Sequence, residues 1–130
     1  MAKEELIYQL SILQQQTQQI QEQLQLVAQN RIELEDLLKG LEELKGKKGG
    51  DALASLGRGI FLDVKINSEK LIVDVGGKNF VKKDIEDSKK LINNQLEKVN
   101  QFEENLNEEA EKINNQLTNL ISENSQEFNS

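Results

Sequence analysis

The sequence predicts a mainly α-helical chain with a small β insert, in which an antiparallel two-helix coiled coil is joined by two β-hairpins. Three observations predict this fold. Two stretches each carry an aliphatic residue at every seventh position, six times over, and this spacing keeps one stripe of a helix facing a partner helix. The block between them alternates apolar and polar residues with the two-residue period of strands. The chain has no proline, so nothing interrupts either helix.

The first helix is predicted over residues 3–45. Its main heptad positions are Leu6, Leu13, Ile20, Val27, Leu34 and Leu41. Intermediate positions between them give alternating spacings of four and three residues, and these are Leu10, Thr17, Leu24, Arg31 and Leu38. Glutamines fill the other faces. Because glutamine favours helices, we interpret them as a solvated helix surface rather than an aggregation-prone low-complexity run.

The middle segment, residues 46–83, is predicted to hold a flexible link followed by two hairpins. Residues 46–51 are rich in glycine and charge, which is typical of a link. Strands are expected over residues 60–66 and 71–75, a third begins at Phe80 and Val81, and residues 53–56 are a fourth candidate. Gly76 and Gly77 suit a hairpin turn because glycine tolerates positive φ.

The second helix is predicted from Ile85 to about Ile121, within a C-terminal segment of residues 84–130. Asp84 is the expected N-cap, supported by Asp87 in the first turn. The polar residues 122–130 are expected to fray. The main heptad positions are Ile85, Ile92, Val99, Leu106, Ile113 and Leu120.

Equal numbers of heptads predict a register in which Leu41 faces Ile85 and Leu6 faces Leu120. In this register the intermediate layers pair Leu10 with Gln116, Thr17 with Glu109, Leu24 with Phe102, Arg31 with Gln95 and Leu38 with Ser88, so only one layer is fully apolar. Two explanations stay open for so polar a seam. The long side chains snorkel to solvent, or the helices are loosely held and splay.

Composition excludes several classes of function. The chain has neither cysteine nor histidine, which removes disulfides, thiolate chemistry and the commonest general base and metal ligand. A net charge of −7 argues against nucleic acid. The run from Val75 to Asn79 lacks the first glycine and the Ser or Thr of a phosphate-binding loop. We therefore expect no enzyme, cofactor or metal site. The sequence also has no signal peptide and no apolar run long enough to span a bilayer. We therefore expect a soluble cytoplasmic protein with no membrane partner.

The two predicted hairpins imply an oligomer. An isolated pair of strands is marginally stable in water and has unpaired edges. We expect strands of several subunits to pair into a shared sheet or barrel, through Ile60, Leu62, Val64, Ile66, Leu71, Val73, Val75 and Phe80.

The segments around the hairpins resemble a known family. Residues 53–61 (Leu-Ala-Ser-Leu-Gly-Arg-Gly-Ile-Phe) are similar to the Leu-Val-Pro-Leu-Gly-x-Gly entry to the first hairpin of alpha-class prefoldin subunits of the archaeal type. Residues 71–83 resemble that family's Val-x-Val-Gly-x-Gly-Tyr-x-Val-Glu-Lys stretch. The chain departs from the family at Ser55, Lys78, Asn79 and Lys82, which concern turn and surface details. Two hairpins favour the alpha class, since the beta class has one.

The resemblance implies a single prefoldin-like unit over residues 1–130, within a hetero-oligomeric hexamer of two alpha and four beta subunits. Its strands would build a double β-barrel from which six coiled coils extend. It implies an ATP-independent chaperone that captures unfolded proteins at the coiled-coil tips and transfers them to a group II chaperonin. Expected client contacts are Leu6, Ile7, Tyr8, Leu10, Leu13, Leu117, Leu120, Ile121 and Phe128. The alternative is a structural coiled-coil scaffold or spacer that binds no client.

Overall fold

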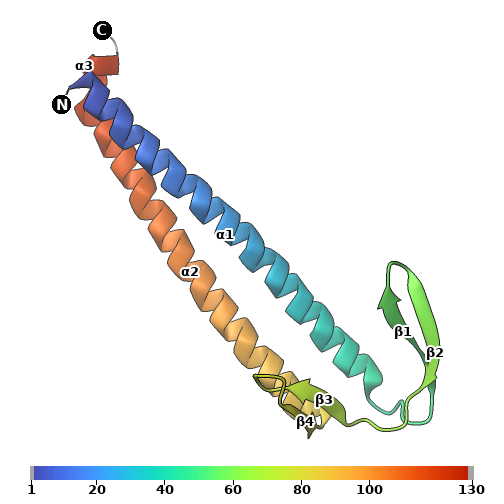
Figure 1. Cartoon of the computed structure of the whole chain (residues 1–130). Coiled ribbons are helices and arrows are strands. Elements are labelled where there is room, and N and C mark those ends of the chain that lie inside the picture. Colours follow the sequence, from blue (N-terminus) through green and yellow to red (C-terminus); the bar gives the residue numbers. More distant parts are fainter. Residues whose placement is uncertain (1, 129–130) are drawn as a thin grey trace. The chain divides into compact units, whose positions relative to one another are not determined.

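The computed structural model describes the backbone of residues 2–128 and the side chains of residues 2–126. Helix α1 (Lys3–Leu44) is followed by strands β1 (Asp51–Gly57), β2 (Ile60–Lys65), β3 (Leu71–Asp74) and β4 (Phe80–Lys83), helix α2 (Ile85–Glu123) and the short helix α3 (Ser125–Phe128). Two long helices with two small antiparallel hairpins confirm the predicted fold class. In Figure 1 the start of α1 and the end of α2 lie side by side, so the chain doubles back as expected.

The chain divides into two compact units. The first, here called the arm unit, comprises residues 1–31 and 97–130, and the second, the hairpin unit, comprises residues 32–96. The arm unit therefore contains the first part of α1 and the last part of α2. The hairpin unit contains all four strands and the helical residues that flank them.

The core of the arm unit confirms the predicted heptads. Ile20, Val27, Leu106 and Ile113 form a cluster of buried residues, and its partly buried neighbours are Leu13, Leu24, Val99, Ala110 and Leu117. In the hairpin unit the buried heptad positions are Leu34, Leu41, Ile85 and Ile92. Full burial of one aliphatic side chain contributes ~1.5–3 kcal/mol, so this seam is the main source of stability for the paired helices.

The intermediate positions of α2 are one residue later than predicted. Half-buried residues lie four positions after each heptad residue, at Lys89, Leu96, Glu103, Ala110 and Leu117. The predicted Gln95, Glu109 and Gln116 are exposed, and Phe102 is 51% exposed, so the expected Leu24–Phe102 layer is wrong. Ser88 is buried, and its hydroxyl donates to the Asp84 carbonyl at 2.8 Å. Since leucine and alanine fill three of the corrected positions, the seam is more apolar than predicted.

The predicted register of the seam is also wrong. In the arm unit, Arg31 donates from Nε to Asn100 Oδ1 at 3.0 Å and pairs with Glu103, whereas the prediction placed Gln95 opposite. In the hairpin unit, Lys89 contacts Glu42, which the prediction placed near Asp84. Asn100 and Glu103 come five and eight residues after the predicted Gln95, and Lys89 comes five residues after the predicted Asp84. In both units α1 therefore contacts residues of α2 later in the chain than predicted.

The hairpins confirm the four predicted strands. Strand β1 is longer than predicted, whereas β2 and β3 each end one residue earlier than predicted. In β1–β2 the register runs from Asp51 opposite Lys65 to Gly57 opposite Ile60, with an irregularity between Ser55 and Gly57. In β3–β4 it runs from Leu71 opposite Lys83 to Asp74 opposite Phe80. Lys78 takes a left-handed conformation (φ 64°) in the β3–β4 turn, where the resemblance expected glycine. The turn therefore forms despite this departure.

The link between α1 and β1 is more ordered than its composition suggests. The Gly49 amide donates to the Ile66 carbonyl at 2.7 Å, and the Ile66 amide donates to the Gly50 carbonyl at 2.9 Å. These bonds extend the β1–β2 ladder past the ends of both strands. The second half of the segment predicted as a flexible link is therefore hydrogen-bonded to the end of β2, and Asp51 belongs to β1 rather than to the link.

Helix α2 begins and ends close to the predicted positions. The Asp87 amide donates to Asp84 Oδ1 at 2.7 Å, which confirms Asp84 as the N-cap. The helix continues to Glu123, two residues past the predicted end, and α3 follows. Residues 129 and 130 of the segment predicted to fray lie outside the described residues. Asn124 contributes to this end by donating its side-chain amide to the Leu120 carbonyl at 2.9 Å. Across the described residues, neither helix offers an apolar stretch long enough to cross a membrane.

Candidate functional site

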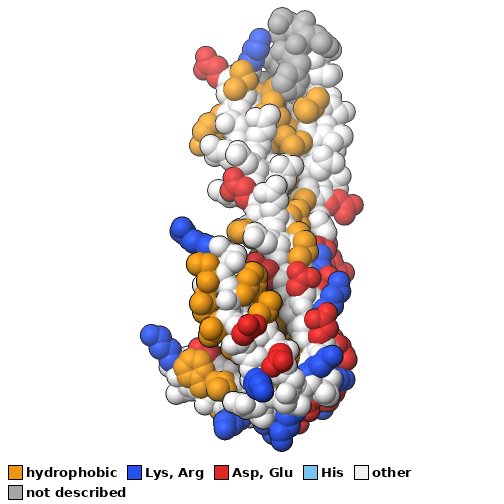
Figure 2. Space-filling model, turned by 90° about the vertical axis from the view of Figure 1, so that its right-hand side faces the viewer, with side chains coloured by type: hydrophobic (Ala, Val, Ile, Leu, Met, Phe, Trp, Pro, Cys, Tyr) orange, Lys and Arg blue, Asp and Glu red, His pale blue; other side chains and the backbone are white. Residues whose placement is uncertain are grey.

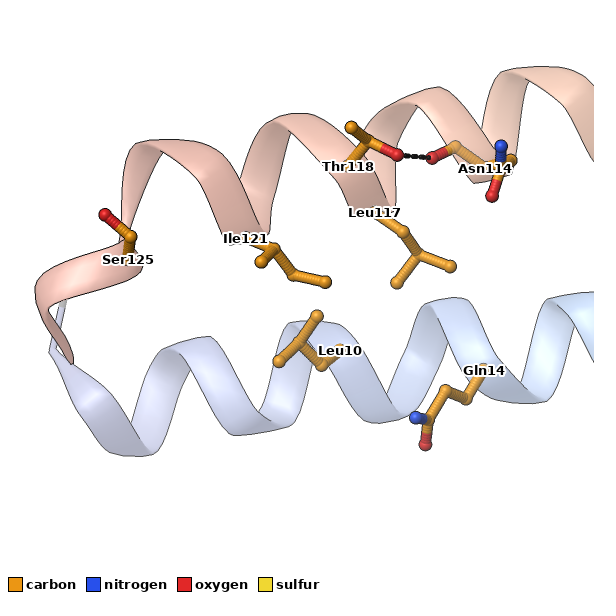
Figure 3. Close-up of a pocket in the computed structure, with 7 residues that line it drawn as sticks. All are labelled: Leu10, Gln14, Asn114, Leu117, Thr118, Ile121 and Ser125. Carbon is orange, nitrogen blue, oxygen red and sulfur yellow. Dashed lines mark hydrogen bonds between the residues drawn. The ribbon is translucent and has the colours of Figure 1, made fainter. Parts of the chain in front are cut away.

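The paired helix ends in the arm unit are flanked by two apolar grooves. The first has a volume of about 550 Å³ and is lined by Leu10, Gln14, Asn114, Leu117, Thr118, Ile121 and Ser125. Figure 3 shows Leu10 of α1 pointing toward Leu117 and Ile121 of α2, while Gln14 points away from them. The Thr118 hydroxyl donates to the Asn114 carbonyl at 2.9 Å, so this hydroxyl is already occupied. The groove therefore has an apolar floor and an uncharged polar rim.

The second groove involves neighbouring turns of the same two helices. Its volume is about 370 Å³, and its lining residues are Gln9, Ile12, Leu13, Gln116, Asn119, Leu120 and Glu123. Among the described residues that line the two grooves, Glu123 alone is charged. Leucine and isoleucine form the floor, and amides form much of the rim. Such a surface can bury apolar side chains of a partner, and its amides can donate to or accept from a partner's backbone.

The predicted client-contact residues differ widely in accessibility. Ile7, Tyr8 and Ile121 are exposed by 56%, 66% and 48%. Leu10, Leu13, Leu117 and Leu120 are half-buried and line the grooves. Leu6 is 1% exposed, so it is buried in the seam and is not accessible to a client in this conformation. Phe128 was also predicted, and its side chain lies outside the described residues.

Sequence analysis missed two residues that contribute apolar surface to the arm unit. Ile12 lines the second groove and is 36% exposed. Leu26 is 66% exposed and lines a third groove of about 390 Å³ together with Phe102. A signal for Ile12 was present, because it follows Tyr8 by four residues and so shares its helix face outside the seam. A signal for Leu26 was also present. Leu26 directly precedes the heptad residue Val27 and therefore lies beside the seam, so its apolar side chain is expected on the surface.

The predicted assembly residues lie on the two hairpins, and most of them are accessible. Ile60, Leu62, Val75 and Phe80 are each exposed by more than half, whereas Val64, Ile66, Leu71 and Val73 are half-buried. Figure 2 views the side that bears β1–β2 and shows hydrophobic side chains gathered on it. The register puts Leu62 opposite Ala54 and Val64 opposite Ala52, so one face of this hairpin is apolar throughout. Leu53, Phe61 and Ile72 add exposed apolar surface that the prediction omitted.

A cluster of four charged residues lies where α1 ends and α2 begins in the hairpin unit. Lys45 pairs with Glu86 at 2.6 Å and with Glu42 at 3.1 Å, and Lys89 also contacts Glu42. Hydrogen bonds from Lys89 and from Lys45 hold the pKa of Glu42 below its usual value, and the bond from Lys89 has the larger effect. The hydrogen bond from Lys45 lowers the pKa of Glu86, and the same two carboxylates raise the pKa of Lys45. The contacts within this cluster stabilise the charged forms of its side chains. Lys45 and Glu86 also line a cavity of about 450 Å³ in the hairpin unit. Among the described residues, no group of three or more acidic side chains is placed to hold a metal ion.

Comparison with known proteins assigns the architecture to a family. The family model described as Prefoldin subunit matches residues 13–130. The chain belongs to the prefoldin family. It is 30% identical over 92 residues to Prefoldin subunit alpha of Methanobrevibacter smithii, covering 70% of this chain and 63% of that protein. It is 38% identical over 87 residues to Prefoldin subunit alpha 1 of Thermococcus kodakarensis, covering 65% of this chain and 60% of that protein.

The alpha-type resemblance is confirmed by these relatives and by the two hairpins. The chain spans less than two thirds of the length of the curated relatives it matches. Among solved structures, a chain of filamentous PFD from Methanocaldococcus jannaschii, determined by cryo-EM, superposes with a TM-score of 0.77 at 20% identity. The match covers 88% of this chain and 96% of that one, so the two share a fold.

Proposed function

We propose that this chain is an ATP-independent chaperone subunit that captures unfolded proteins in the grooves of its paired helix ends and transfers them to a group II chaperonin. The chain acts in the cytoplasm as one prefoldin-like unit over residues 1–130, and it is no enzyme. The single observation that carries this proposal is the pair of open apolar grooves on either side of the seam.

The grooves suit non-native chains for a physical reason. An unfolded polypeptide exposes apolar side chains and unpaired backbone groups in no fixed arrangement. Leu10, Leu117 and Ile121 offer an apolar floor without a shaped, enclosed pocket, and Asn114 at the rim supplies an amide group. Such a surface binds many sequences weakly, and several arms on one particle raise the effective affinity by linking the binding events. The predicted client contacts Leu6, Ile7, Tyr8, Leu10, Leu13, Leu117, Leu120, Ile121 and Phe128 stay part of this proposal.

We also propose that the hairpins assemble with beta-class subunits into a hexamer of two alpha and four beta chains. The exposed apolar face of β1–β2 and the open edges of both two-stranded sheets support assembly, because each leaves apolar groups and backbone donors in water. The solved structure that shares this fold is described as filamentous. Self-assembly of this chain is therefore the competing arrangement, and the mass of the purified chain with and without a beta subunit distinguishes the two.

The test of client capture uses two substitutions in the grooves. Ile12→Gln with Ile121→Gln removes accessible apolar surface and leaves the buried seam intact. Ile32→Gln is the matched control, because Ile32 is 58% exposed on α1 but belongs to the hairpin unit. The assembled particle should suppress aggregation of a thermally unfolding client, and the double variant should lose most of this protection while the control keeps it.

The same experiment decides between a chaperone and a scaffold. If the chain is a structural spacer, neither the groove variant nor the wild type protects the client, and assembly is unchanged in both. Equal protection by wild type, groove variant and control would place client binding elsewhere on the chain. Light scattering on each sample confirms that the particle stays assembled.

A further inference from the structure

The two units of the chain differ sharply in charge. The arm unit holds 11 acidic and 4 basic residues, which is a net charge of −7. The hairpin unit holds 12 acidic and 12 basic residues and is neutral. The entire net charge of the protein therefore belongs to the unit that carries the apolar grooves.

One acidic side chain lines these grooves, and others lie on neighbouring turns of the same two helices. Glu123 lines the second groove and is exposed. Glu109 and Glu111 are exposed on α2 one to two turns before the lining residues begin, and Glu4 and Glu5 are exposed in the first turn of α1. Lys3 and Lys112 are the basic residues in the same stretches, and they offset only part of this charge. At 1.5 Å of helix rise per residue, these carboxylates lie within about one Debye length, ~10 Å at moderate salt, of a segment in the grooves.

We propose that the grooves select non-native segments in which basic side chains flank apolar ones. This inference rests on the proposed function and names the class of client segment. The apolar side chains enter the leucine and isoleucine floor, and lysine or arginine on either side meets the exposed carboxylates. Segments flanked by aspartate or glutamate are repelled by the same field. Nucleic acids and anionic membrane surfaces are repelled as well, which leaves a basic, apolar polypeptide as the occupant that the charge pattern fits.

The expected discrimination is moderate because the carboxylates are exposed. An exposed ion pair changes affinity by about two- to fourfold, so two or three pairs amount to a preference of ~10-fold for a basic segment over an acidic one. The preference also depends on salt, since charges in water are screened over a few ångströms at high ionic strength. Apolar contact in the grooves is unaffected by screening and sets the affinity that remains.

The test uses three labelled peptides with one shared apolar core, flanked by lysine, glutamine or glutamate. Binding to the assembled particle is measured by fluorescence anisotropy at low and at high salt. The lysine peptide should bind ~10-fold more tightly than the glutamate peptide at low salt, and the glutamine peptide should fall between them. At high salt the three affinities should converge.

A charge-removal variant locates the effect on the arm unit. Glu109→Gln, Glu111→Gln and Glu123→Gln remove three charges near the grooves and preserve helix propensity. The matched control, Glu33→Gln, Glu35→Gln and Glu43→Gln, removes three exposed charges from the α1 portion of the hairpin unit. The first variant should lose most of the discrimination between lysine and glutamate peptides, and the control should retain it.

The outcomes separate this inference from the proposed function. Equal low-salt binding of all three peptides overturns the charge preference and leaves client capture intact. The same loss of discrimination in both variants overturns the assignment to the grooves. Binding of none of the peptides contradicts the proposed function and this inference with it.

Discussion

The arm unit and the hairpin unit solve the problem of apolar surface in opposite ways. In the arm unit, heptad residues such as Ile20 and Leu106 are buried against each other within one chain. In the hairpin unit, apolar strand residues such as Ile60, Leu62 and Phe80 are each more than half exposed. The arm unit therefore has its own core, whereas the hairpins carry apolar faces that are open in the single chain. Under the proposed function, these open faces are the surfaces that other subunits cover.

The comparison also separates two kinds of exposed apolar surface. On the hairpins it coincides with unpaired strand edges, which favours permanent pairing. On the arm it lies on helices whose backbone is fully hydrogen-bonded, beside amide-rich rims. Without edges to extend, the arm surface suits reversible contact with variable partners.

The largest expected effect tests whether the apolar face of the hairpins is needed for assembly. Leu62→Asp places a charge on the apolar face of β1–β2, opposite Ala54. We expect the particle to dissociate completely to single chains, because burying an unpaired carboxylate in an interface costs several kcal/mol. Multi-angle light scattering measures the mass, and circular dichroism should show that the helices persist. Leu37→Asp is the control, since Leu37 is 47% exposed and belongs to α1 rather than to a strand. An intact particle in the Leu62 variant would contradict the role of this face.

The second prediction addresses the core of the arm. Leu106→Ala removes a side chain that is 4% exposed in the central cluster, and we expect a loss of ~2–5 kcal/mol in the free energy of unfolding. Leu26→Ala is the matched control, because Leu26 is 66% exposed, and its effect should stay within about 0.5 kcal/mol. Thermal melting followed by circular dichroism compares the two. Similar losses in both variants would mean that the seam lacks the tight packing described here.

Much of this contrast could be predicted from sequence, and the failures have a common cause. Period alone identified both helices, all main heptad positions and four strands. It could not decide whether the intermediate positions of α2 lie three or four residues after each heptad residue, because both choices give a continuous stripe. Leu96, Ala110 and Leu117 favoured a spacing of four residues. Phe102 and the head-on pairing of the two equal heptad series favoured a spacing of three. The register error followed from that symmetry, since equal series suggest head-on layers whereas real side chains interlock.

For the candidate site, the heptads predicted that the start of α1 and the end of α2 lie together. Five of the predicted client-contact residues line the two grooves there, namely Leu10, Leu13, Leu117, Leu120 and Ile121, and their contact with clients stays a prediction. The grooves themselves depend on residues beside the seam, such as Ile12 and Gln14, and on the offset between the helices. Neither is encoded in the seven-residue period. Likewise, composition called residues 46–51 flexible, and only the pairing of Gly49 and Gly50 with Ile66 shows how backbone hydrogen bonds order them.

A smaller effect sharpens the account of the hairpins. Lys78 has φ 64° next to Gly77 at φ 60°, a combination typical of a two-residue turn in which non-glycine residues are strained. Lys78→Gly should stabilise the hairpin by about 0.5–1 kcal/mol, which is the left-handed penalty less the entropy that glycine adds to the unfolded chain. Lys82→Gly, in the middle of β4, should destabilise it by a similar amount. Chemical denaturation of the assembled particle measures both changes. A shift in the same direction for both variants would show that the turn is not strained at Lys78.

The smallest expected effect is a pH dependence of stability that comes from the charged cluster of the hairpin unit. Hydrogen bonds from Lys89 and Lys45 lower the pKa of Glu42, and Lys45 lowers that of Glu86, from an ordinary value of 4.5. Below about pH 5 the unfolded chain therefore binds protons that the folded chain does not, so stability should fall as the pH drops through this range. The raised pKa of Lys45 matters only at high pH. Its contribution to stability is lost only above pH 10.5, the ordinary pKa of lysine.

Thermal melting between pH 3 and pH 7 checks the acid side of this prediction. Lys45→Met with Lys89→Met should flatten the pH dependence by removing the donors that lower both pKa values. Lys39→Met with Lys90→Met is the control, since Lys39 is exposed on α1, Lys90 is exposed on α2, and neither makes any of the described ion pairs of the cluster. Because the paired side chains remain between about a fifth and three fifths exposed, high salt should weaken the effect in the wild type. An unchanged pH profile in the Lys45 and Lys89 variant would mean that these contacts contribute nothing to the stability of the hairpin unit.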